Sequence, residues 1–408
     1  MVKQNNRAIN AVASNRVVTT QRPALAIVSN VPTPYRTHLY RRFATEIPEY
    51  KLYSIFTRAA TDFSWSIKMP PEINPVDFSE GYGITSESPL RYPLRDWFKA
   101  GRIIRWTRAH NIRAMIINGF GDLISLRLIW YCYRSRTPVF GRADANIKGD
   151  KRTGFQLWLR RLRLGWMIRH CNGVMPMHDF GQQFFEKYGA DPKRCFWVPV
   201  EPDYEMFSHA DRDELETFRA ERGLSPEHRY LLFSGRLIQL KRVDLLIDAF
   251  ARLADSWPQW DLLIAGDGPL RTDVERRVPD ALKRRVKWLG FCEVDQLRLA
   301  YHAAHILVLP SDRDNCPLVV NEAMAAGLPV VASNVVGSAC AIVDDGVSGK
   351  FFEVGNLDSL TEALAEVMAD TKYNSYRNAV GQALAAWRTK ADPVAGLRKA
   401  LRFVNLLP

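Results

Sequence analysis

The chain has 408 residues, which suggests two or three domains, and 47% of them are hydrophobic, as in a globular protein with large cores. Its best apolar run, Leu123–Tyr133, contains Arg127 and is shorter than the roughly 18 residues that cross a bilayer. The first 22 residues hold three arginines, no acid and no apolar core. We therefore expect a disordered tail and not a secretory signal, with an organelle transit peptide as the alternative. The six cysteines form no Cys-x-x-Cys pair, so we expect reduced thiols in an intracellular protein.

The net charge of +12 is concentrated in one half of the chain. Residues 1–210 hold 31 Lys and Arg against 17 Asp and Glu, or +14. The remaining residues hold 25 against 27, or −2. A basic half indicates an anionic partner, which is a membrane lipid, a phosphorylated acceptor or a nucleic acid. A solvated basic surface with no partner is the alternative interpretation.

Strands and helices alternate along the first half. The expected strands are the short apolar runs Ala24–Ser29, Lys51–Phe56, Ala114–Ile117, Pro138–Phe140, Gly173–Met177 and Cys195–Val198. Helices are expected after the first strand, with Leu39, Tyr40 and Phe43 inward, and over Trp97–His110 and Phe155–Arg169. Residues 59–92 are rich in Pro, Gly and Ser and predict a long, partly irregular loop. The alternation predicts a mostly parallel sheet flanked by helices.

A second series of elements follows a polar, acidic break at Glu205–Pro226. Its expected strands are Tyr230–Ser234, Asp261–Ala265, Val286–Leu289, His305–Pro310 and Pro329–Ser333, and its expected helices are Val243–Leu253, Leu360–Met368 and Tyr376–Phe403. We therefore predict an α/β protein with two Rossmann-like domains facing a cleft. Residues 1–22 form the tail, 23–205 the first domain and 206–385 the second. Residues 386–408 form a helix that crosses back to the first domain.

Two loops of the second domain contain residues that suit a phosphate. Gly235–Lys241, GRLIQLK, directly follows a predicted strand, and its Gly235 opens the loop. Arg236 offers a planar fork to phosphate oxygens and Lys241 adds a mobile point charge. Ala265–Pro269, AGDGP, follows the next strand, and its glycines allow a tight turn. Each loop alone is equally typical of surface charge or ordinary turn chemistry.

A third segment carries two acids eight residues apart, Asp314 and Glu322, between a buried strand and a helix start. Sugar hydroxyls donate hydrogen bonds that a carboxylate accepts strongly, at about 1.5–3 kcal/mol each. The first acid suits a sugar and the second a ribose diol. The amides of Asn315 and Cys316, near the helix N-terminus, suit the leaving phosphate. A helix cap and a surface Glu would explain the acid pair alone, but the three segments in this order favour a sugar-nucleotide site.

Together these segments resemble family 4 of the retaining glycosyltransferases, whose fold is called GT-B. The resemblance is strongest over Tyr230–Asn356. It includes Leu-Gly-Phe at Leu289–Phe291, Asp-Asn-Cys-Pro followed by Asn-Glu-Ala-Met-Ala-Ala-Gly-Leu-Pro-Val-Val, and Asp-Gly-Val-Ser-Gly-Lys at Asp345–Lys350. The resemblance implies the GT-B fold and a nucleoside-diphosphate sugar as donor substrate.

The resemblance also implies a role for each matching residue. Arg236 and Lys241 would bind the diphosphate and stabilise it as it leaves. Asp314 would contact hydroxyls of the donor sugar. Glu322 would hold the ribose, and the backbone near Phe291 would border the base.

The first domain resembles the family less closely. Val31–Arg36, VPTPYR, is similar to the opening loop of one subset but lacks the more common Gly-Gly pair. Its Arg36 is a candidate for the acceptor side of the cleft. Many members place a histidine after a middle strand, whereas Gly141–Asn146 reads GRADAN. Arg142 or Asp144 is therefore expected to take that place.

The predicted helix Phe155–Arg169 is apolar on two faces with arginines between them. One face carries Phe155, Trp158, Leu159, Leu162 and Trp166, and the other Leu157, Leu164 and Ile168. A helix that is apolar on two sides is usually buried, so packing is the simpler interpretation. Docking on an anionic membrane is the alternative. Four histidines have surface or packing roles as their simplest interpretation: His38, His178, His302 and His305.

We therefore predict a metal-independent retaining glycosyltransferase that uses no cofactor. It would act on a glycan or lipid-linked acceptor in polysaccharide or glycolipid assembly, at the cytoplasmic face of a membrane. Two departures from the family bear on sugar or acceptor identity: Ala341, where an acid is frequent, and Asp314, where Glu is common. The missing histidine leaves an inactive GT-B partner protein as an alternative. A nucleic-acid-binding protein is a weaker one, because no helix-turn-helix, RNA-binding or zinc signature accompanies the basic half.

Overall fold

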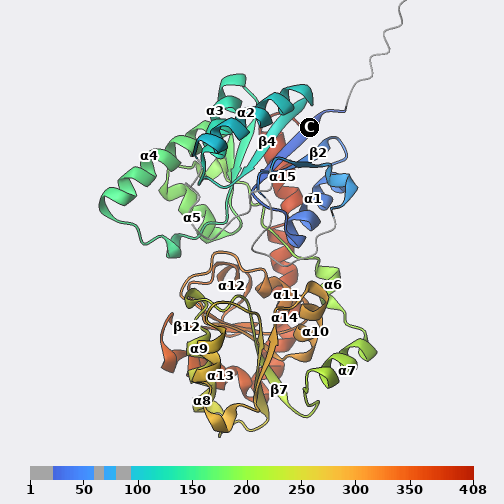
Figure 1. The fold of residues 1–408 in the computed structure, drawn as a ribbon, viewed down its shortest axis with the longest axis vertical. Coiled ribbons are helices and arrows are strands. Elements are labelled where there is room, and N and C mark those ends of the chain that lie inside the picture. The colour runs from blue at the N-terminus through green and yellow to red at the C-terminus, as the bar shows by residue number, and fades with distance from the viewer. Residues whose placement is uncertain (1–21, 59–68, 80–92) are drawn as a thin grey trace, which may run out of the picture.

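The structure, a computed structural model, describes residues 22–58, 69–79 and 93–408, which form two domains of similar architecture (Figure 1). The strands of the first domain are β1 (Ala24–Ser29), β2 (Lys51–Phe56), β3 (Pro75–Asp77), β4 (Ile112–Asn118), β5 (Val139–Arg142) and β6 (Gly173–Met175). Its helices are α1 (Pro34–Glu46), α2 (Pro93–Ala109), α3 (Leu123–Ser135), α4 (Gly154–His170) and α5 (Asp179–Lys187). The predicted tail lies almost wholly outside the described residues.

The second domain repeats this plan. Its strands are β7 (Arg229–Ser234), β8 (Trp260–Ala265), β9 (Val286–Gly290), β10 (Ile306–Leu309), β11 (Val330–Ser333) and β12 (Gly349–Phe352). Its helices are α6 (Tyr204–Ser208), α7 (Arg212–Glu221), α8 (Val243–Leu253), α9 (Arg271–Arg277), α10 (Val294–Ala303), α11 (Val319–Ala325), α12 (Gly337–Ile342) and α13 (Leu357–Met368). Two further helices, α14 (Asp370–Lys390) and α15 (Pro393–Phe403), end the chain.

The strand order in both sheets explains why the core strands are apolar runs. The order is β3-β2-β1-β4-β5-β6 in the first sheet and β12-β11-β10-β7-β8-β9 in the second, with parallel pairs throughout the described strands. Helices cover both faces of a parallel sheet, so side chains on both faces are buried. All six residues of β1, ALAIVS, are buried accordingly. The predicted fold of two Rossmann-like domains is confirmed.

The last helices return to the first domain, as predicted (Figure 1). The expected single helix over Tyr376–Phe403 is broken, because Pro393 starts α15 after Asp392 caps it. On α15, Leu397 and Leu401 pack into the core of the first domain. Gly396 lies against the carbonyl of Trp197, where a Cβ would be only 1.8 Å from the oxygen. The chain end therefore ties the two domains together behind the cleft.

Three other expectations differ from the structure. Cys195–Val198 was predicted as a strand but makes only one isolated bridge to β6, because the neighbouring Pro176 has no N–H to continue a ladder. β3 lies inside the segment expected to be an irregular loop, whose residues 59–68 and 80–92 are outside the described part. The polar break forms α6 and α7, which pack on α11 and α10 of the second domain, so it is not a simple linker.

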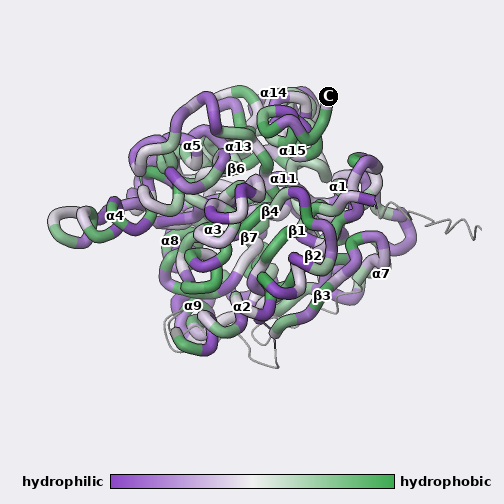
Figure 2. The backbone as a smooth tube through the Cα atoms, turned by 90° about the horizontal axis from the view of Figure 1, so that it is seen from above, coloured by the Kyte–Doolittle hydropathy of each residue, from purple (hydrophilic) through white to green (hydrophobic). Residues whose placement is uncertain are grey.

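The helix α4 is exposed along much of its length, contrary to the packing interpretation. Leu164, Met167 and Ile168 are buried, but the first turns project beyond the rest of the domain (Figures 1 and 2). Phe155 is 70% exposed and Trp158 is 54% exposed. Only the second half of the helix therefore packs on the core. Within the described ranges, no helix combines the length and apolar character needed to cross a membrane.

Candidate functional site

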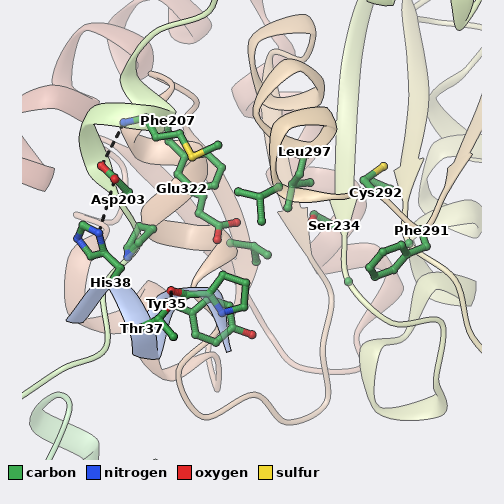
Figure 3. Close-up of a pocket in the computed structure, with 18 of the residues that line it drawn as sticks. Tyr35, Thr37, His38, Asp203, Phe207, Ser234, Phe291, Cys292, Leu297 and Glu322 are labelled. Carbon is green, nitrogen blue, oxygen red and sulfur yellow. Dashed lines mark hydrogen bonds and ion pairs between the residues drawn. The ribbon is translucent and has the colours of Figure 1, made fainter. Parts of the chain in front are cut away.

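A cavity of about 980 Å³ lies between the two domains, at the carboxyl ends of the parallel strands. From the first domain, α1 contributes Tyr35 and His38. From the second, Glu322 of α11 points into the space opposite Tyr35 (Figure 3). Five of the residues predicted for the donor site line this cavity: Gly235, Arg236, Lys241, Phe291 and Glu322. The fold thus brings together residues that are up to 87 positions apart in the chain.

The position of this cavity follows from the strand order of the second sheet. β7 and β10 are neighbours, but the chain runs from β7 toward β8 on one side and from β10 toward β11 on the other. The loops after these two strands therefore diverge and open a crevice, which is where open α/β sheets bind ligands. The Nζ atom of Lys241, from the first loop, contacts a carboxylate oxygen of Asp314, from the second. The loop Gly235–Lys241 and the acid Asp314 are therefore in direct contact.

The side chain of Arg236 is exposed to the cavity and has no hydrogen bond or ion pair to any other described residue. A guanidinium held at a cavity with no protein partner is free to bind an anion. Lys241 differs, because Asp314 already balances its charge. The pair of cations predicted for a diphosphate is therefore present as one free cation and one shared with a carboxylate.

The glycines of the two loops are required by close packing. Gly266 has φ +148°, and a Cβ there would lie 1.9 Å from the carbonyl oxygen of Gly235. Only glycine fits such an approach of backbone to backbone. The AGDGP loop therefore packs against the start of the loop that carries Arg236, and its Asp267 and Gly268 also border the cavity. This contact holds both loops at the cavity rim.

Glu322 is almost fully buried at the base of the cavity. Its Oε2 accepts a hydrogen bond of 2.7 Å from the hydroxyl of Tyr301, which belongs to α10. Burial raises the pKa of the Glu322 carboxyl to about 7, and the hydrogen bond from Tyr301 opposes this only in part. The second acid of the pair is thus a desolvated group whose second oxygen is open to a ligand hydroxyl.

This raised pKa predicts a pH-dependent stability. The folded protein binds a proton at Glu322 more tightly than the unfolded chain, whose value is near 4.5. The free energy of unfolding therefore falls as pH rises from about 4.5 to 7 and is constant above that, a change of about 3 kcal/mol. Glu322→Gln keeps the acceptor for Tyr301 and removes the charge. We expect this variant to be more stable than wild type at pH 8 and equally stable near pH 4.5, measured by denaturant unfolding.

Glu362→Gln is the matched control, because Glu362 is exposed on α13. It should change stability equally little at both pH values. If Glu322→Gln had the same effect at pH 4.5 and pH 8, the raised pKa would be wrong.

Asn315 and Cys316 lie elsewhere than expected. The carbonyl of Asn315 accepts a hydrogen bond of 2.9 Å from Nε2 of His178, and its side-chain amide donates to the carbonyl of Asp144 at 3.2 Å. Both residues precede the helix, since α11 begins only at Val319, and neither lines the donor cavity. Their assigned role on the leaving phosphate remains a prediction. His178 is buried in a contact between the domains, which agrees with a packing role and not with a surface role.

The three acceptor-side candidates have different surroundings. Arg36 donates to Oδ1 of Asn30 and to the carbonyl of Val31, at 2.6 and 2.7 Å. Arg142 is buried, and it holds the carbonyl of Val198 and the side chain of Asn118 at 2.9 Å each. Burial lowers the pKa of Arg142 to about 10. Arg142 lines neither of the two main cavities and is a support beneath the cleft.

Asp144 is open to the cleft and close to the first acid of the pair. Partial removal from water, and then the charge of Asp314, raise the pKa of Asp144 above its ordinary value. Of the two residues expected in place of the missing histidine, Asp144 is therefore the one that faces the cleft. In the described ranges, no three His, Cys, Asp or Glu side chains are grouped as a metal site requires.

Some residues of the site gave no signal in the sequence. Tyr301 lies 21 positions before Glu322 and looks like an ordinary core residue of a helix. Nδ1 of His38 lies 3.6 Å from a carboxylate oxygen of Asp203, and His38 lines the cavity (Figure 3). Tyr35 lies at the start of α1, and burial followed by the charge of Glu322 raises the pKa of Tyr35. The site residues that could be predicted from the sequence are polar residues in the loops after strands, and these three residues lie in helices instead.

Part of the chain matches a known family. Residues 215–384 match the family model described as "Glycosyl transferases group 1". Over these residues, which are fewer than half of the chain, the protein is similar to the group 1 glycosyl transferases. D-inositol 3-phosphate glycosyltransferase of Geodermatophilus obscurus is 36% identical over 204 residues, which cover 47% of this chain and 44% of that protein. An uncharacterized glycosyltransferase of Methanocaldococcus jannaschii is 32% identical over 165 residues, covering 40% and 42%. The match spans about half the length of these curated relatives.

Solved structures extend the likeness to both domains of the protein. Sucrose-phosphate synthase from Thermosynechococcus elongatus has a TM-score of 0.73 at 17% identity, and covers 94% of this chain and 100% of its own. Anabaena HepE in complex with UDP and glucose has a TM-score of 0.70 at 15% identity, with the same coverage. At these identities the likeness shows the fold, which is the GT-B arrangement of two Rossmann-like domains around a cleft. The expected fold is therefore confirmed across the chain.

Proposed function

We propose that this protein is a glycosyltransferase that moves a sugar from a nucleoside-diphosphate sugar to a hydroxyl of an acceptor in the cleft. The observation that carries the proposal is the meeting of Lys241 and Asp314 at the crevice between β7 and β10. Arg236, with no partner in the described structure, and the buried Glu322 line the same cavity. The two cations suit the diphosphate of a nucleotide sugar, and the two carboxylates suit its sugar and ribose hydroxyls.

The division of labour follows from the chemistry of the donor. Arg236 and Lys241 bind the diphosphate and neutralise the charge that grows on it as the glycosidic bond breaks. When the donor binds, the contact between Asp314 and Lys241 weakens, and Asp314 accepts hydrogen bonds from sugar hydroxyls. Glu322 accepts from the ribose, with Tyr301 holding its other oxygen. Phe291, which is 43% exposed at the cavity edge, borders the base.

The proposed reaction retains the configuration of the transferred sugar and needs no metal. The acceptor hydroxyl approaches the anomeric carbon from the face of the leaving group, and its proton passes to the departing diphosphate oxygen. The two side-chain cations supply the positive charge on the leaving group. Retention is supported by the resemblance of the donor motifs to family 4, and nuclear magnetic resonance of the product anomer tests it.

The donor class is tested with a panel of UDP, GDP and ADP and their sugars. We expect one nucleoside diphosphate to raise the melting temperature and its sugar to be turned over. UDP is tried first because the HepE structures contain it. Binding without release of any sugar would identify an inactive GT-B partner, and binding of none would overturn the proposal.

We also propose that the first domain docks on the anionic surface of a membrane, with the protein at its cytoplasmic face. Three neighbouring helices, α2, α3 and α4, expose large apolar side chains. They are Leu94, Phe98, Trp130, Tyr133, Phe155, Trp158, Leu159 and Leu162. The net charge of +14 over residues 1–210 complements anionic lipid, at about 1 kcal/mol for each Lys or Arg near the surface. A lipid-linked acceptor would then meet the cleft at the membrane.

Co-sedimentation with vesicles tests this docking. We expect binding to rise with the fraction of anionic lipid and to fall with salt, since the effect is screened within about 8–10 Å. Phe155→Ser with Trp158→Ser should weaken binding about tenfold or more, because burying one such side chain contributes about 1.5–3 kcal/mol. Val347→Ser, an exposed apolar residue of the second domain, should have no effect. Equal recovery on neutral and anionic vesicles would contradict docking.

A further inference from the structure

A second cavity, of about 340 Å³, has Asp144 and Asn315 in its lining. It is lined by both domains, and arginine is its most frequent side chain. The four arginines are Arg152, Arg160 and Arg163, at or before α4, and Arg313, from the loop after β10. Asp144 and Asp150 are the acids of the lining. The positive charge therefore exceeds the negative charge around this space.

The acid Asp150 does not neutralise these arginines. Its Oδ2 accepts from the hydroxyl of Tyr188 at 2.6 Å and from Nζ of Lys187 at 2.9 Å. Its Oδ1 lies 3.4 Å from both Arg152 and Arg160. One carboxylate is thus shared among three cations. Burial acts against ionisation, but the hydrogen bonds from Tyr188 and Lys187 lower the pKa of Asp150, which stays charged.

The other two arginines have no partner of their own. The side chains of Arg163 and Arg313 make no hydrogen bond or ion pair with another residue in the part of the chain that the structure describes. Arg313 packs its aliphatic stem against Gly149, where a Cβ would lie 2.8 Å from Cδ, so the side chain is held over the cavity. Two guanidinium groups, one from each domain, therefore border one cavity with their charge unbalanced. Such groups match the oxygens of a phosphate.

The cavity adjoins the reacting centre of the proposed function. Asp144 lines the second cavity and also lies near Asp314, which contacts Lys241 at the donor crevice. A molecule that placed a phosphate among the arginines would extend past Asp144 toward the donor sugar. A carboxylate at that point accepts a hydrogen bond from an incoming hydroxyl. The second cavity is therefore placed for an acceptor and not for the donor diphosphate.

We propose that Arg163 and Arg313 bind a phosphate group of the acceptor, so that the acceptor is a phosphorylated alcohol with a free hydroxyl facing Asp144. This rests on the proposed function for the identity of the bound molecule as acceptor. The phosphate belongs to a soluble phosphorylated polyol or to a lipid headgroup, which share this chemistry. Because the arginines come from different domains, the bound phosphate also bridges the two domains.

The test uses the full chain and glycerol 3-phosphate as probe, with glycerol as the uncharged match, in calorimetry at constant ionic strength. We expect glycerol 3-phosphate to bind and glycerol not to bind. Arg163→Gln and Arg313→Gln should each weaken binding about tenfold, as expected for losing a charge-assisted hydrogen bond. Arg169→Gln is the control, since Arg169 is an exposed arginine of the same helix outside the cavity. Equal effects of all three variants, or no binding of the probe, would overturn the proposal.

Two further measurements separate this inference from the proposed function and identify the source of the phosphate. Binding of the nucleoside diphosphate is measured in the same variants and should be unchanged. If no nucleotide binds while glycerol 3-phosphate still does, the anion site stands and the glycosyltransferase proposal fails. Vesicles of phosphatidylcholine with phosphatidic acid are then added as competitors. Competition that vesicles of phosphatidylcholine alone do not cause supports a lipid headgroup, and its absence supports a soluble acceptor.

Discussion

Arg236→Ala is expected to reduce the turnover of the donor sugar by about 10²–10³, the usual loss when one group that stabilises a developing charge is removed. The side chain is exposed and has no partner within the described structure, so its removal leaves no buried charge behind. The loss therefore reports the contact with the diphosphate and not a change of fold. The affinity for the nucleoside diphosphate should fall about tenfold or more, because a charge-assisted hydrogen bond contributes about 1.5–3 kcal/mol.

The measurements are steady-state transfer and nucleotide titration, with unfolding curves to show that the fold is kept. Arg252→Ala provides the control, since Arg252 is exposed on α8 and pairs with Asp358 at the surface. Its turnover and nucleotide affinity should equal those of wild type. A fully active Arg236→Ala enzyme would show that the diphosphate binds elsewhere.

Asp314→Asn should separate catalysis from nucleotide binding. The substitution keeps the size of the side chain and removes its charge. The backbone is held independently, because the carbonyl of Asp314 accepts from the N–H of Gly337 at 3.0 Å and from Nδ2 of Asn146 at 3.3 Å. We expect transfer to fall about 10²-fold, as the donor sugar loses a charged acceptor for its hydroxyls. Lys241 loses its carboxylate partner, so nucleoside-diphosphate binding should be unchanged or tighter.

Asp312→Asn is the matched control in the same loop. Asp312 pairs with Arg242 at 3.1 Å, whereas Asp314 contacts Lys241, and neither acid is in the lining of either cavity. A partly exposed pair of this kind contributes about 0–1 kcal/mol, so the variant should transfer sugar at the wild-type rate. Full turnover by Asp314→Asn, or an equal loss in both variants, would remove Asp314 from the catalytic site.

The elements of secondary structure were largely predictable because their signals lie in contiguous residues. Ala24–Ser29 and Val243–Leu253 have the predicted limits, since a run of apolar side chains or a helical spacing is local. That the residues proposed for the donor lie close together was predictable for a related reason. Gly235 and Arg236 directly follow one parallel strand and Asp314 follows another, and parallel strands end at a common edge. A residue that follows a predicted parallel strand can therefore be assigned to that edge of the sheet from the sequence alone.

Errors arose where a neighbour distant in sequence decides the outcome. Cys195–Val198 has a strand-like composition, but its partner strand ends at Pro176, which cannot donate. The helix α4 has two apolar faces, and only packing against the core shows that the first turns stay exposed. His178 looked unremarkable until the loop after β10 came to lie against it. In each case the local pattern was equally consistent with another environment.

The sequence by itself determined the order of strands and helices, the two-domain fold class and the donor motifs, because these depend on periodicity and on residues that follow strands. The tertiary structure alone decided the contact of Lys241 with Asp314, the burial of Glu322 against Tyr301, and the placing of Arg163 and Arg313 in the lining of one cavity. These residues are 73, 21 and 150 positions apart. Contacts between residues so far apart in the chain depend on strand order and on how the domains face each other, which no local pattern encodes.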